Sequence, residues 1–447
     1  MARLAWFSPL PPVRSGVAAY SAEVVMALRA EHEVDVFTDR PAPGGRSAHD
    51  FIWEHQQRPY DLTVYQLGNS SFHDYIWPYL FRYPGLTVLH DAHLHHARAA
   101  QLLRVKRVAD YREEFKANDR AAGPEMAELA VKGFDTYLYY SWPMRKLAVD
   151  ASKVTAVHAA LMADALRDES PSAAVETIRL GHGESVTGEE AQVARGRVRE
   201  RYGIDHDDVV FGVFGALTPE KRLPQILDAF AEVHRYAPRA RLMLAGATAS
   251  HYDLAADIER RNLGALVVQT GYLPDGELTA HLVACDVSMN LRWPTAREMS
   301  GPWLRALAAG RATVVVDLAH TADVPSLDPR TWTISHARPA GQPAPEPIAV
   351  AIDILDEAHS LRLAMRRLAL DAGLRARLGA AAADFWHREH SMQRMLDDYR
   401  QVIPRALERP APQIPSAWPA HLVDRGQRQL DELLKPFEVP PPLRVTL

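Results

Sequence analysis

A segment suited to holding a phosphate is the most informative chemical feature of the sequence, and it runs from Ser300 to Gly310. Ser300 or Gly301 is a natural N-cap, and Pro302 fits the first helical position. Gly310 fits the C-terminal cap, so we expect a short helix between these residues. Because a helix N-terminus presents unpaired N–H groups and the positive end of the helix dipole, this segment predicts an anion site.

Three further residues would form or balance this anion site. The backbone N–H groups of Trp303 and Leu304 would point towards the ligand. Arg305 lies in the first turn, where the dipole disfavours a cation by roughly 0.3–1 kcal/mol. The partner of Arg305 could be an anionic ligand or simply Glu298 on the preceding loop.

A second candidate for phosphate contact is the loop Gly215–Arg222, which lies between an expected strand and an expected helix. Lys221 would project at the carboxyl edge of the sheet, where doubly wound domains bind their ligands. Taken alone, the loop is more simply a solvated charged turn. Because it shares a sheet edge with the helix start described above, we expect Gly215, Thr218 and Lys221 to contact the same ligand.

The first half of the chain adds a weaker candidate, Gly16, between its first expected strand and first expected helix. A glycine lets a ligand approach the backbone closely, and the helix after it offers another N-terminus. A single glycine in a turn is usually only a turn, so Gly16 gains weight only in combination with other residues.

Four histidines and an aspartate lie close together after another expected strand. In chain order they are His90, Asp91, His93, His95 and His96. They could bind a metal ion, although no second ligand cluster occurs at a metal-site spacing. Alternatively, His90 could bind a sugar hydroxyl or a phosphate while Asp91 orients it. The strand-end loop at 65–70 carries amide side chains suited to hydroxyl recognition.

These residues need a scaffold, and short apolar runs that alternate with helical-period segments are typical of parallel βα units. In the first half we expect strands at Leu4–Phe7, Val34–Thr38, Leu62–Gln66, Thr87–His90, Val154–His158 and Thr177–Leu180. In the second half we expect strands at Val209–Phe214, Arg241–Ala245, Val267–Thr270, Val287–Leu291, Thr313–Val316 and Thr331–Ile334. The expected helices are Ala18–Ala30, Gln225–Arg235, Tyr252–Arg261, Glu277–Ala284, Trp303–Ala309, Ala349–Glu357, Leu361–Ala372, Leu374–His387, Met392–Ile403 and a short one near Arg425–Leu434. This plan predicts two doubly wound domains, and the boundary between them in the sequence is expected within the polar stretch 183–208.

Composition limits the function classes. The 447 residues are 47% hydrophobic and 24% charged, which is typical of a folded globular protein of about two domains. The net charge of −5 gives no reason to expect nucleic acid as a partner. The single cysteine, Cys285, reads as a small buried hydrophobe rather than a nucleophile. With no signal peptide or long apolar run in view, we expect a cytoplasmic protein.

Several common motifs are absent from the sequence, namely the phosphate-binding P-loop, the dinucleotide-binding glycine fingerprint and the nucleophile elbow. Peripheral membrane contact is an open possibility, because residues Leu102 to Arg107 could form one basic helical face backed by apolar side chains. A solvated helix is the simpler interpretation of that pattern.

The order and spacing of these residues resemble the retaining, nucleotide-sugar-dependent glycosyltransferases of family 4, also described as glycosyl transferases group 1, over roughly residues 1–405. In the first loop the family carries Gly-Arg followed by Glu-Lys. Gly215, Glu220 and Lys221 match this pattern, but Ala216 stands at the arginine position. One of two cations that the family directs at the diphosphate is therefore missing.

The second loop of the family carries two glutamates before a segment similar to Ala306–Gly310. Glu298 matches the first, which in the family contacts the transferred sugar. Arg305 stands near the position of the second, which normally binds the nucleotide ribose, with one residue fewer between the two positions. We hypothesise that Arg305 replaces the cation lost at Ala216.

The resemblance implies an α/β protein with the GT-B fold, in which two doubly wound Rossmann-like domains face each other across a cleft and a C-terminal helix crosses back. Its implied parts are an N-terminal acceptor domain at 1–190, a C-terminal donor domain at 191–385, the crossing helix at 386–405 and a Pro-rich extension at 406–447. The glycine-containing loop and the strand-end histidine that the family places at the cleft match Gly16 and His90.

The implied activity is the transfer of a sugar from a nucleotide-diphosphate sugar to an acceptor hydroxyl, with retention at the anomeric carbon and without a metal or a cofactor, as in polysaccharide or glycoconjugate biosynthesis. Lys221 and the helix N-terminus would stabilise the leaving diphosphate, Glu298 would hold the sugar, and His90 would lie near its reacting face. The acceptor could be a sugar, a lipid-linked molecule or a small molecule. Two other functions stay open: a metal-dependent hydrolase that uses the His90–His96 cluster, and a non-catalytic nucleotide-sugar-binding protein.

Overall fold

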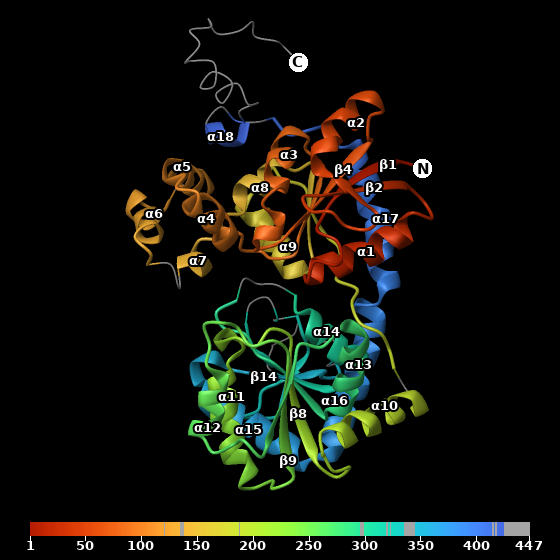
Figure 1. Ribbon diagram of the computed structural model, residues 1–447, viewed down its shortest axis with the longest axis vertical. Coiled ribbons are helices and arrows are strands. Elements are labelled where there is room, and N and C mark those ends of the chain that lie inside the picture. Colours follow the sequence, from red (N-terminus) through yellow and green to blue (C-terminus); the bar gives the residue numbers. More distant parts are fainter. Residues whose placement is uncertain are drawn as a thin grey trace, which may run out of the picture. The chain divides into compact units, whose positions relative to one another are not determined.

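The apolar runs of the sequence form two parallel β-sheets in the structure, which is a computed structural model (Figure 1). It describes residues 1–119, 121–134, 138–186, 188–295, 299–318, 321, 323–334, 345–413, 415 and 418–423. The chain divides into two compact units. The first contains Met1–Val157, Ala165–Glu176 and Val402–Leu447, and the second contains His158–Asp164 and Thr177–Gln401.

The first sheet has the strand order β3-β2-β1-β4-β5-β6-β7, and the pairs from β3 to β6 are parallel. Its strands are β1 (Arg3–Phe7), β2 (Glu33–Thr38), β3 (Gly45–Ser47), β4 (Leu62–Leu67), β5 (Leu86–Leu89), β6 (Val154–Val157) and β7 (Val175–Thr177). Every residue of β4, β5 and β6 is buried, as expected for parallel strands that are covered on both faces. The order reverses between β1 and β4.

Helices surround this sheet, and one group of them forms a separate cluster beside it (Figure 1). They are α1 (Gly16–Leu28), η1 (Ala48–Asp50), α2 (Phe51–Gln57), η2 (Ser71–His73), α3 (Ile76–Arg82), α4 (His95–Arg104), α5 (Val108–Asn118), α6 (Pro124–Val131), α7 (Leu138–Ser141), α8 (Lys146–Ala151), α9 (Ala160–Glu169) and α18 (Ala420–Val423). Helices α4 to α7 share an apolar core that includes Leu102, Tyr111 and Phe115. Of this region, the sequence indicated only a short helix at Leu102 to Arg107.

The second sheet repeats the plan, with seven parallel strands in the order β10-β9-β8-β11-β12-β14-β13. Its strands are β8 (Val209–Phe214), β9 (Ala240–Ala245), β10 (Val267–Gly271), β11 (Val287–Asn290), β12 (Ala312–Val316), β13 (Ser326–Leu327) and β14 (Ala349–Ile352). The order reverses between β8 and β11, which is where a doubly wound sheet opens a crevice at its carboxyl edge.

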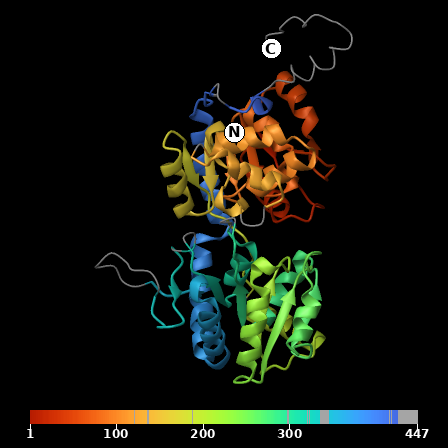
Figure 2. The same ribbon diagram turned by 90° about the vertical axis from the view of Figure 1, so that its left-hand side faces the viewer.

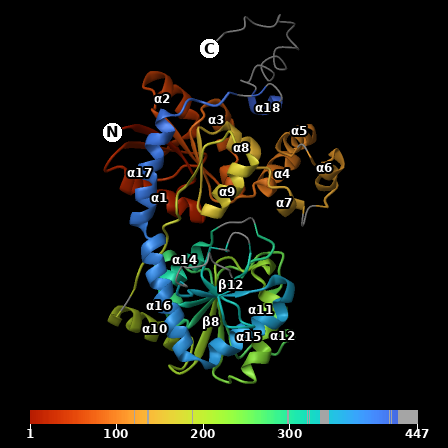
Figure 3. The same cartoon turned by 180° about the vertical axis from the view of Figure 1, so that it is seen from behind.

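Helices cover both faces of the second sheet (Figures 1 and 2). They are α10 (Gly188–Arg201), η3 (Pro219–Lys221), α11 (Leu223–His234), α12 (Leu254–Arg260), α13 (Asp275–Ala284), α14 (Gly301–Ala308), η5 (Ile354–Asp356), α15 (Glu357–Leu370) and α16 (Ala372–Glu389). Helices α11, α12 and α15 pack on one face, and α10, α13 and α14 pack on the other. After α16 the chain continues into α17 (Met392–Glu408), which Figure 3 shows in full.

The predicted fold class, two doubly wound α/β domains, is confirmed, but two predicted elements are wrong and a third is shifted along the chain. The expected helix at Ala349–Glu357 begins as strand β14, because Ile348–Ile352 is an apolar run that is buried on both faces. The expected strand Thr331–Ile334 is an irregular segment in which Ile334 makes one isolated bridge to Leu327. The expected strand Thr177–Leu180 is replaced by β7, two residues earlier.

The expected domain limits stay a prediction, and the structure adds two facts about them. The expected boundary after residue 190 falls inside α10, whose Val198 packs in the core of the second unit. Helix α17 divides between the two units at Gln401 and Val402. Of the Pro-rich extension, the four-residue helix α18 packs on α3. The helix expected near Arg425–Leu434 lies outside the described residues.

Candidate functional site

The first loop of the site follows β8, and a glycine with a left-handed backbone turns it. Gly215 has a φ of +88°, which residues with a Cβ rarely adopt. The turn η3 then returns the side chain of Lys221 to the end of β8, where Nζ donates a hydrogen bond to the carbonyl oxygen of Phe214. A Cβ at position 215 would lie only 3.3 Å from Nζ, so the glycine keeps the space beside the ammonium group open.

Gly246 positions this loop, although the sequence analysis did not single it out. It follows β9 directly and has a φ of +158°. A Cβ on Gly246 would lie 2.0 Å from the carbonyl oxygen of Gly215. Only a glycine therefore lets the loops after β8 and β9 approach this closely. The available signal, a lone glycine after a strand, is too common to identify such a position.

Helix α14 begins where the sequence predicts, but its first N–H groups are already paired. Oγ of the N-cap residue Ser300 accepts the N–H of Trp303 at 3.4 Å. The N–H of Leu304 donates to the carbonyl oxygen of Ser300 at 3.1 Å. The prediction that Trp303 and Leu304 offer free donors is therefore wrong, because the cap and the first helical turn satisfy both. Pro302 has no N–H, so the amide of Gly301 is the donor that this turn can offer.

The side chain of Arg305 contacts a histidine from a distant part of the sequence. Its Nε donates to Nε2 of His182 at 2.9 Å. Burial, together with the charge of Arg305, lowers the pKa of His182 to about 3, so this ring nitrogen is an unprotonated acceptor. A cavity lies beside the start of α14, and the described residues that line it do not include Arg305. The hypothesis that Arg305 replaces the cation missing at Ala216 is therefore not supported.

A cavity of about 300 Å³ brings most of the candidates of the second unit together. The predicted residues that line it are Gly215, Lys221, Ser300, Gly301 and Trp303. It lies at the carboxyl ends of β8, β11 and β12, beside the point where the strand order of the sheet reverses. This is the position at which doubly wound domains bind ligands, so the cavity is the candidate site.

Arg292 supplies a second cation to the cavity, and the sequence analysis missed it. It comes two residues after the end of β11 and is exposed. It lines the cavity together with Lys221 and Ala216. Two cations bind a diphosphate more tightly than one does, because each donates charge-assisted hydrogen bonds to the phosphate oxygens. The loop after β11 therefore brings a cation to the same cavity as Ala216, the position at which the family carries its arginine.

Two other predicted residues of this unit are not placed in the cavity. Thr218 precedes η3, and its carbonyl oxygen accepts the N–H of Lys221 at 3.1 Å, so it shapes the loop without lining the cavity. Glu298 lies outside the described residues. The described residues nearest to it in the sequence, Thr295 and Met299, both line the cavity.

In the first unit, His90 lies just after β5 and is held in one orientation. Its Nε2 donates to Oε1 of the buried Gln66 at 2.8 Å. The ring also packs edge-on against Tyr20, with centroids 4.7 Å apart. Because an amide oxygen can only accept, Nε2 of His90 carries the hydrogen of this bond.

Gly16 begins α1, where the N-cap Ser15 accepts the N–H of Val17 at 3.3 Å. A Cβ at Gly16 would meet no atom of the described residues within 4 Å. Nothing in the described part of the chain therefore requires a glycine at this position, and a ligand role for Gly16 stays a prediction.

The amide side chains at the end of β4 and just after it hydrogen-bond to other groups of the protein, whereas the sequence suggested that they would bind a ligand hydroxyl. Gln66 holds His90 as described, and Oδ1 of Asn69 accepts the N–H of Ala97 at 2.9 Å. The N–H of Asn69 in turn donates to Oδ2 of Asp91 at 2.6 Å. These contacts fix the strand-end loop that carries His90.

The histidines after β5 do not assemble a metal site. Both ring nitrogens of His95 are used, with the carbonyl oxygen of Trp142 at 2.8 Å and the hydroxyl of Tyr111 at 2.7 Å. Within the described part of the chain, His90 to His96 do not supply three ligand atoms that could reach one ion. The alternative of a hydrolase built on this cluster therefore lacks its ligand set.

The basic residues after α4 do not share a helical face. Helix α4 ends at Arg104, and Lys106 has a φ of +60° that turns the chain towards α5. The single face predicted for Leu102 to Arg107 is therefore wrong, and peripheral membrane contact stays a prediction. Among the helices of the described residues, none combines the length and the apolar character needed to span a bilayer.

Cys285 is a buried thiol, as the sequence predicts. Burial and the neighbouring Asp286 raise its pKa to about 12. A thiol with so little thiolate is a poor nucleophile, so Cys285 acts as a packing residue between β11 and its covering helices.

Comparison with known proteins identifies a likeness in sequence and in fold. Residues 208–332, which include β8, η3, β11 and α14, match the model of a protein family described as Glycosyl transferases group 1. No curated protein matches the chain.

Solved structures resemble nearly the whole chain. Sucrose-phosphate synthase from Thermosynechococcus elongatus is 14% identical with a TM-score of 0.63, and the match covers 91% of this chain and 99% of that one. HepE of Anabaena, in complex with UDP and glucose, is 13% identical with a TM-score of 0.61, over 90% of this chain and 100% of that one. WaaG, a glycosyltransferase involved in lipopolysaccharide biosynthesis, is 13% identical with a TM-score of 0.58, over 90% of this chain and 99% of that one. At these identities the likeness shows a shared fold, GT-B.

Proposed function

We propose that this chain, which resembles group 1 glycosyltransferases and has the GT-B fold, transfers a sugar from a nucleotide-diphosphate sugar to an acceptor hydroxyl. The observation that carries the proposal is the cavity at the reversal point of the second sheet. Lys221, Arg292 and the start of α14 converge on this cavity, and all of them lie within the segment that matches the family model. Cations and a helix N-terminus are what a leaving diphosphate requires.

The roles of individual residues follow from this arrangement. Lys221 and Arg292 stabilise the negative charge that develops as the bond between the sugar and the diphosphate breaks. The amide of Gly301 adds a donor at the positive end of the α14 dipole. Glu298 holds the transferred sugar, and His90 lies near its reacting face, as the family resemblance implies. We propose that the reaction retains the anomeric configuration and proceeds without a metal ion.

A thermal-shift panel tests donor binding directly. UDP, GDP, ADP and TDP are each added to the full chain, and one of them should stabilise it by roughly 2.7 kcal/mol at about 100 times its dissociation constant. UDP is the first choice, because the structural relative HepE is in complex with UDP. If none of the four shifts the unfolding midpoint at millimolar concentration, nucleotide-sugar binding is excluded and the proposed function with it.

Turnover separates an enzyme from a binding protein. The nucleotide that stabilises the chain identifies the donor base, and release of that nucleotide from its sugar conjugates is then followed with candidate acceptors. Release that depends on an acceptor supports the transferase, whereas tight binding without release supports the non-catalytic alternative. Product NMR reports the anomeric configuration, and full turnover in excess EDTA is expected.

The two arginines near α14 should differ in their contribution to binding. Arg292→Ala should weaken nucleoside diphosphate binding about tenfold or more, since a hydrogen bond to a charged group contributes about 1.5–3 kcal/mol. Arg305→Ala should leave this affinity nearly unchanged, because Arg305 contacts His182 and does not line the cavity. Titration calorimetry with the stabilising nucleotide measures both. The opposite order of effects would return the missing-cation role to Arg305.

A further inference from the structure

A histidine of the C-terminal extension is buried against the first unit. His421 lies on α18, and its side chain is only 3% exposed. Apolar neighbours on the same segment are buried with it: Trp418 packs edge-on against Phe81 of α3, with centroids 5.2 Å apart, and Leu422 is 9% exposed. The segment is therefore a folded part of the first unit, and the polar atoms of His421 must find partners inside it.

One ring nitrogen of His421 has such a partner. Nε2 lies 2.7 Å from Oε1 of Glu114, a residue of α5 with no exposed surface. Glu114 also forms a buried ion pair with Arg98, so it is a carboxylate and can only accept. Nε2 of His421 therefore carries a hydrogen and donates it to Glu114.

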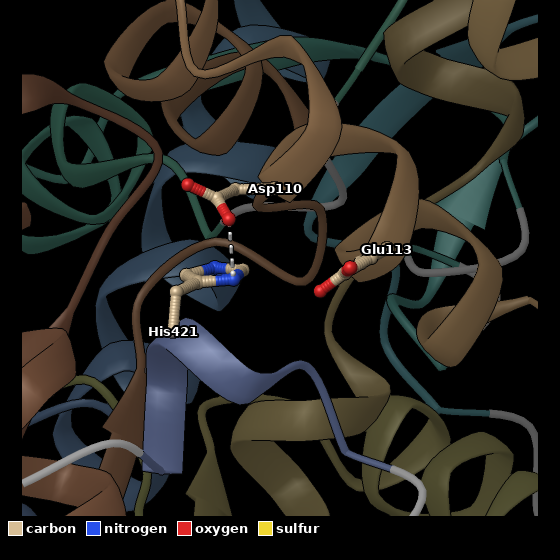
Figure 4. Close-up of side chains that lie close together, drawn as sticks. All are labelled: Asp110, Glu113 and His421. Carbon is tan, nitrogen blue, oxygen red and sulfur yellow. Dashed lines mark ion pairs between the residues drawn. The ribbon is translucent and has the colours of Figure 1, made fainter. Parts of the chain in front are cut away.

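The other ring nitrogen lies within ion-pair distance of a second carboxylate but makes no hydrogen bond with it. Nδ1 of His421 is buried and makes no hydrogen bond. Oδ1 of Asp110 faces it at 3.3 Å, while Oδ2 of Asp110 accepts from Nε of Arg107 at 2.5 Å. If Nδ1 carries only its lone pair, two electron-rich atoms face each other, and a positive species between them would stabilise the pair. Figure 4 shows the two side chains directed at one another.

A third ligand lies beside this pair. Glu113, one turn along α5 from Asp110, places a carboxylate oxygen so that the ligand atoms of Asp110, Glu113 and His421 all lie within 4.8 Å of one another (Figure 4). Two ligands that each lie about 2.0 Å from a zinc ion at the tetrahedral angle are about 3.3 Å apart. The separation of 3.3 Å between Nδ1 and Oδ1 is therefore compatible with two ligands of one zinc ion.

We propose that Asp110, Glu113 and His421 bind a zinc ion that fastens residues 418–423 to α5. One imidazole and two carboxylates are a zinc donor set, whereas calcium and magnesium prefer oxygen ligands alone. The bond from Nε2 to Glu114 is the carboxylate–histidine contact that commonly orients a metal-bound imidazole. This site is separate from the cavity at Lys221, so it does not depend on the proposed transfer function.

Zinc binding by the full chain tests the proposal. Protein freed of metal with EDTA is titrated with zinc by calorimetry and, in parallel, with cobalt, whose visible absorption reports binding by protein ligands. One ion per chain is expected, and His421→Gln should weaken its binding about tenfold or more. His206→Gln is the matched control: His206 also faces an aspartate, at 3.2 Å from Asp207, but its side chain is 93% exposed. The control should bind zinc as the wild type does.

A second variant guards against a folding defect. Glu113 is exposed, so Glu113→Gln should fold normally. Zinc should raise the unfolding temperature of the wild type and of His206→Gln but not that of Glu113→Gln or His421→Gln. The nucleotide-induced shift of the four proteins should be the same, which separates this site from the donor site. The proposal is wrong if the metal-free wild type binds no zinc at micromolar concentration, or if His421→Gln binds zinc as well as the wild type does. In that case a proton, rather than a metal ion, lies between Nδ1 of His421 and Asp110.

Discussion

Lys221→Ala should lower the turnover number by about 100-fold or more, since removing one preorganised donor to a developing negative charge typically has this effect. The structure supports so large a loss because the ammonium group is held in place. It is bound to the carbonyl oxygen of Phe214 and lies beside Gly215 at the carboxyl end of β8. Steady-state kinetics with the donor identified by the thermal-shift panel would measure the effect. A loss of transition-state stabilisation should reduce kcat and kcat/KM alike.

The control for this prediction is Lys132→Ala, which removes the same charge from an exposed position after α6. It should leave turnover unchanged. Circular dichroism and the unfolding midpoint should be close to wild type for both variants. Near-normal turnover of a folded Lys221→Ala protein at saturating donor would contradict the role given to this lysine.

Arg98→Ala should destabilise the first unit by about 3–5 kcal/mol, because it leaves a buried carboxylate without its cation. Nε of Arg98 donates to Oε2 of Glu114 at 2.9 Å, and its guanidinium stacks 4.1 Å from the ring centre of Trp77. Burial alone would raise the pKa of Glu114, but the charge of Arg98 and the hydrogen bonds from His421 and Arg98 hold it below its ordinary value. Urea unfolding followed by tryptophan fluorescence would measure the loss.

The helix that carries Glu114 provides the control. Arg112 of α5 pairs with Glu128 at the surface, where water screens the interaction, so Arg112→Ala should change stability little. Replacing both buried charges, as in Arg98→Met with Glu114→Leu, removes the unpaired charge but leaves Nε2 of His421 without its acceptor, so it should recover only part of the loss. Equal effects of Arg98→Ala and Arg112→Ala would show that the Arg98 pair contributes no more than a surface pair does.

Much of the fold was predictable because both domains repeat one local pattern. Strand β8 is a continuous apolar run, and parallel sheets produce such runs wherever both faces are covered. The same property explains why β14 was predicted as a helix, since a short apolar run is compatible with a buried helix as well as a strand. The cluster α4 to α7 was missed because its core draws on residues spread from Ala99 to Met144.

The parts of the candidate site that depend on neighbouring residues in the sequence were predictable. The capped start of α14 and the turn that holds Lys221 follow from residue types a few positions apart. Arg292 was missed because its role depends on β11 lying next to β8, which is a property of strand order. The contact between His182 and Arg305 joins residues more than a hundred positions apart, and no local pattern signals it.

The first unit draws on three separate stretches of chain, and this has a consequence for how the protein is made. Trp418, Leu422 and His421 cover groups of α3 and α5, yet the whole of the second unit is encoded before them. On the ribosome, the domain that emerges first therefore completes its packing last. Until residues 418–423 are synthesised, Phe81 and the buried carboxylate of Glu114 lack part of their cover, so the nascent chain should need chaperone protection at this surface.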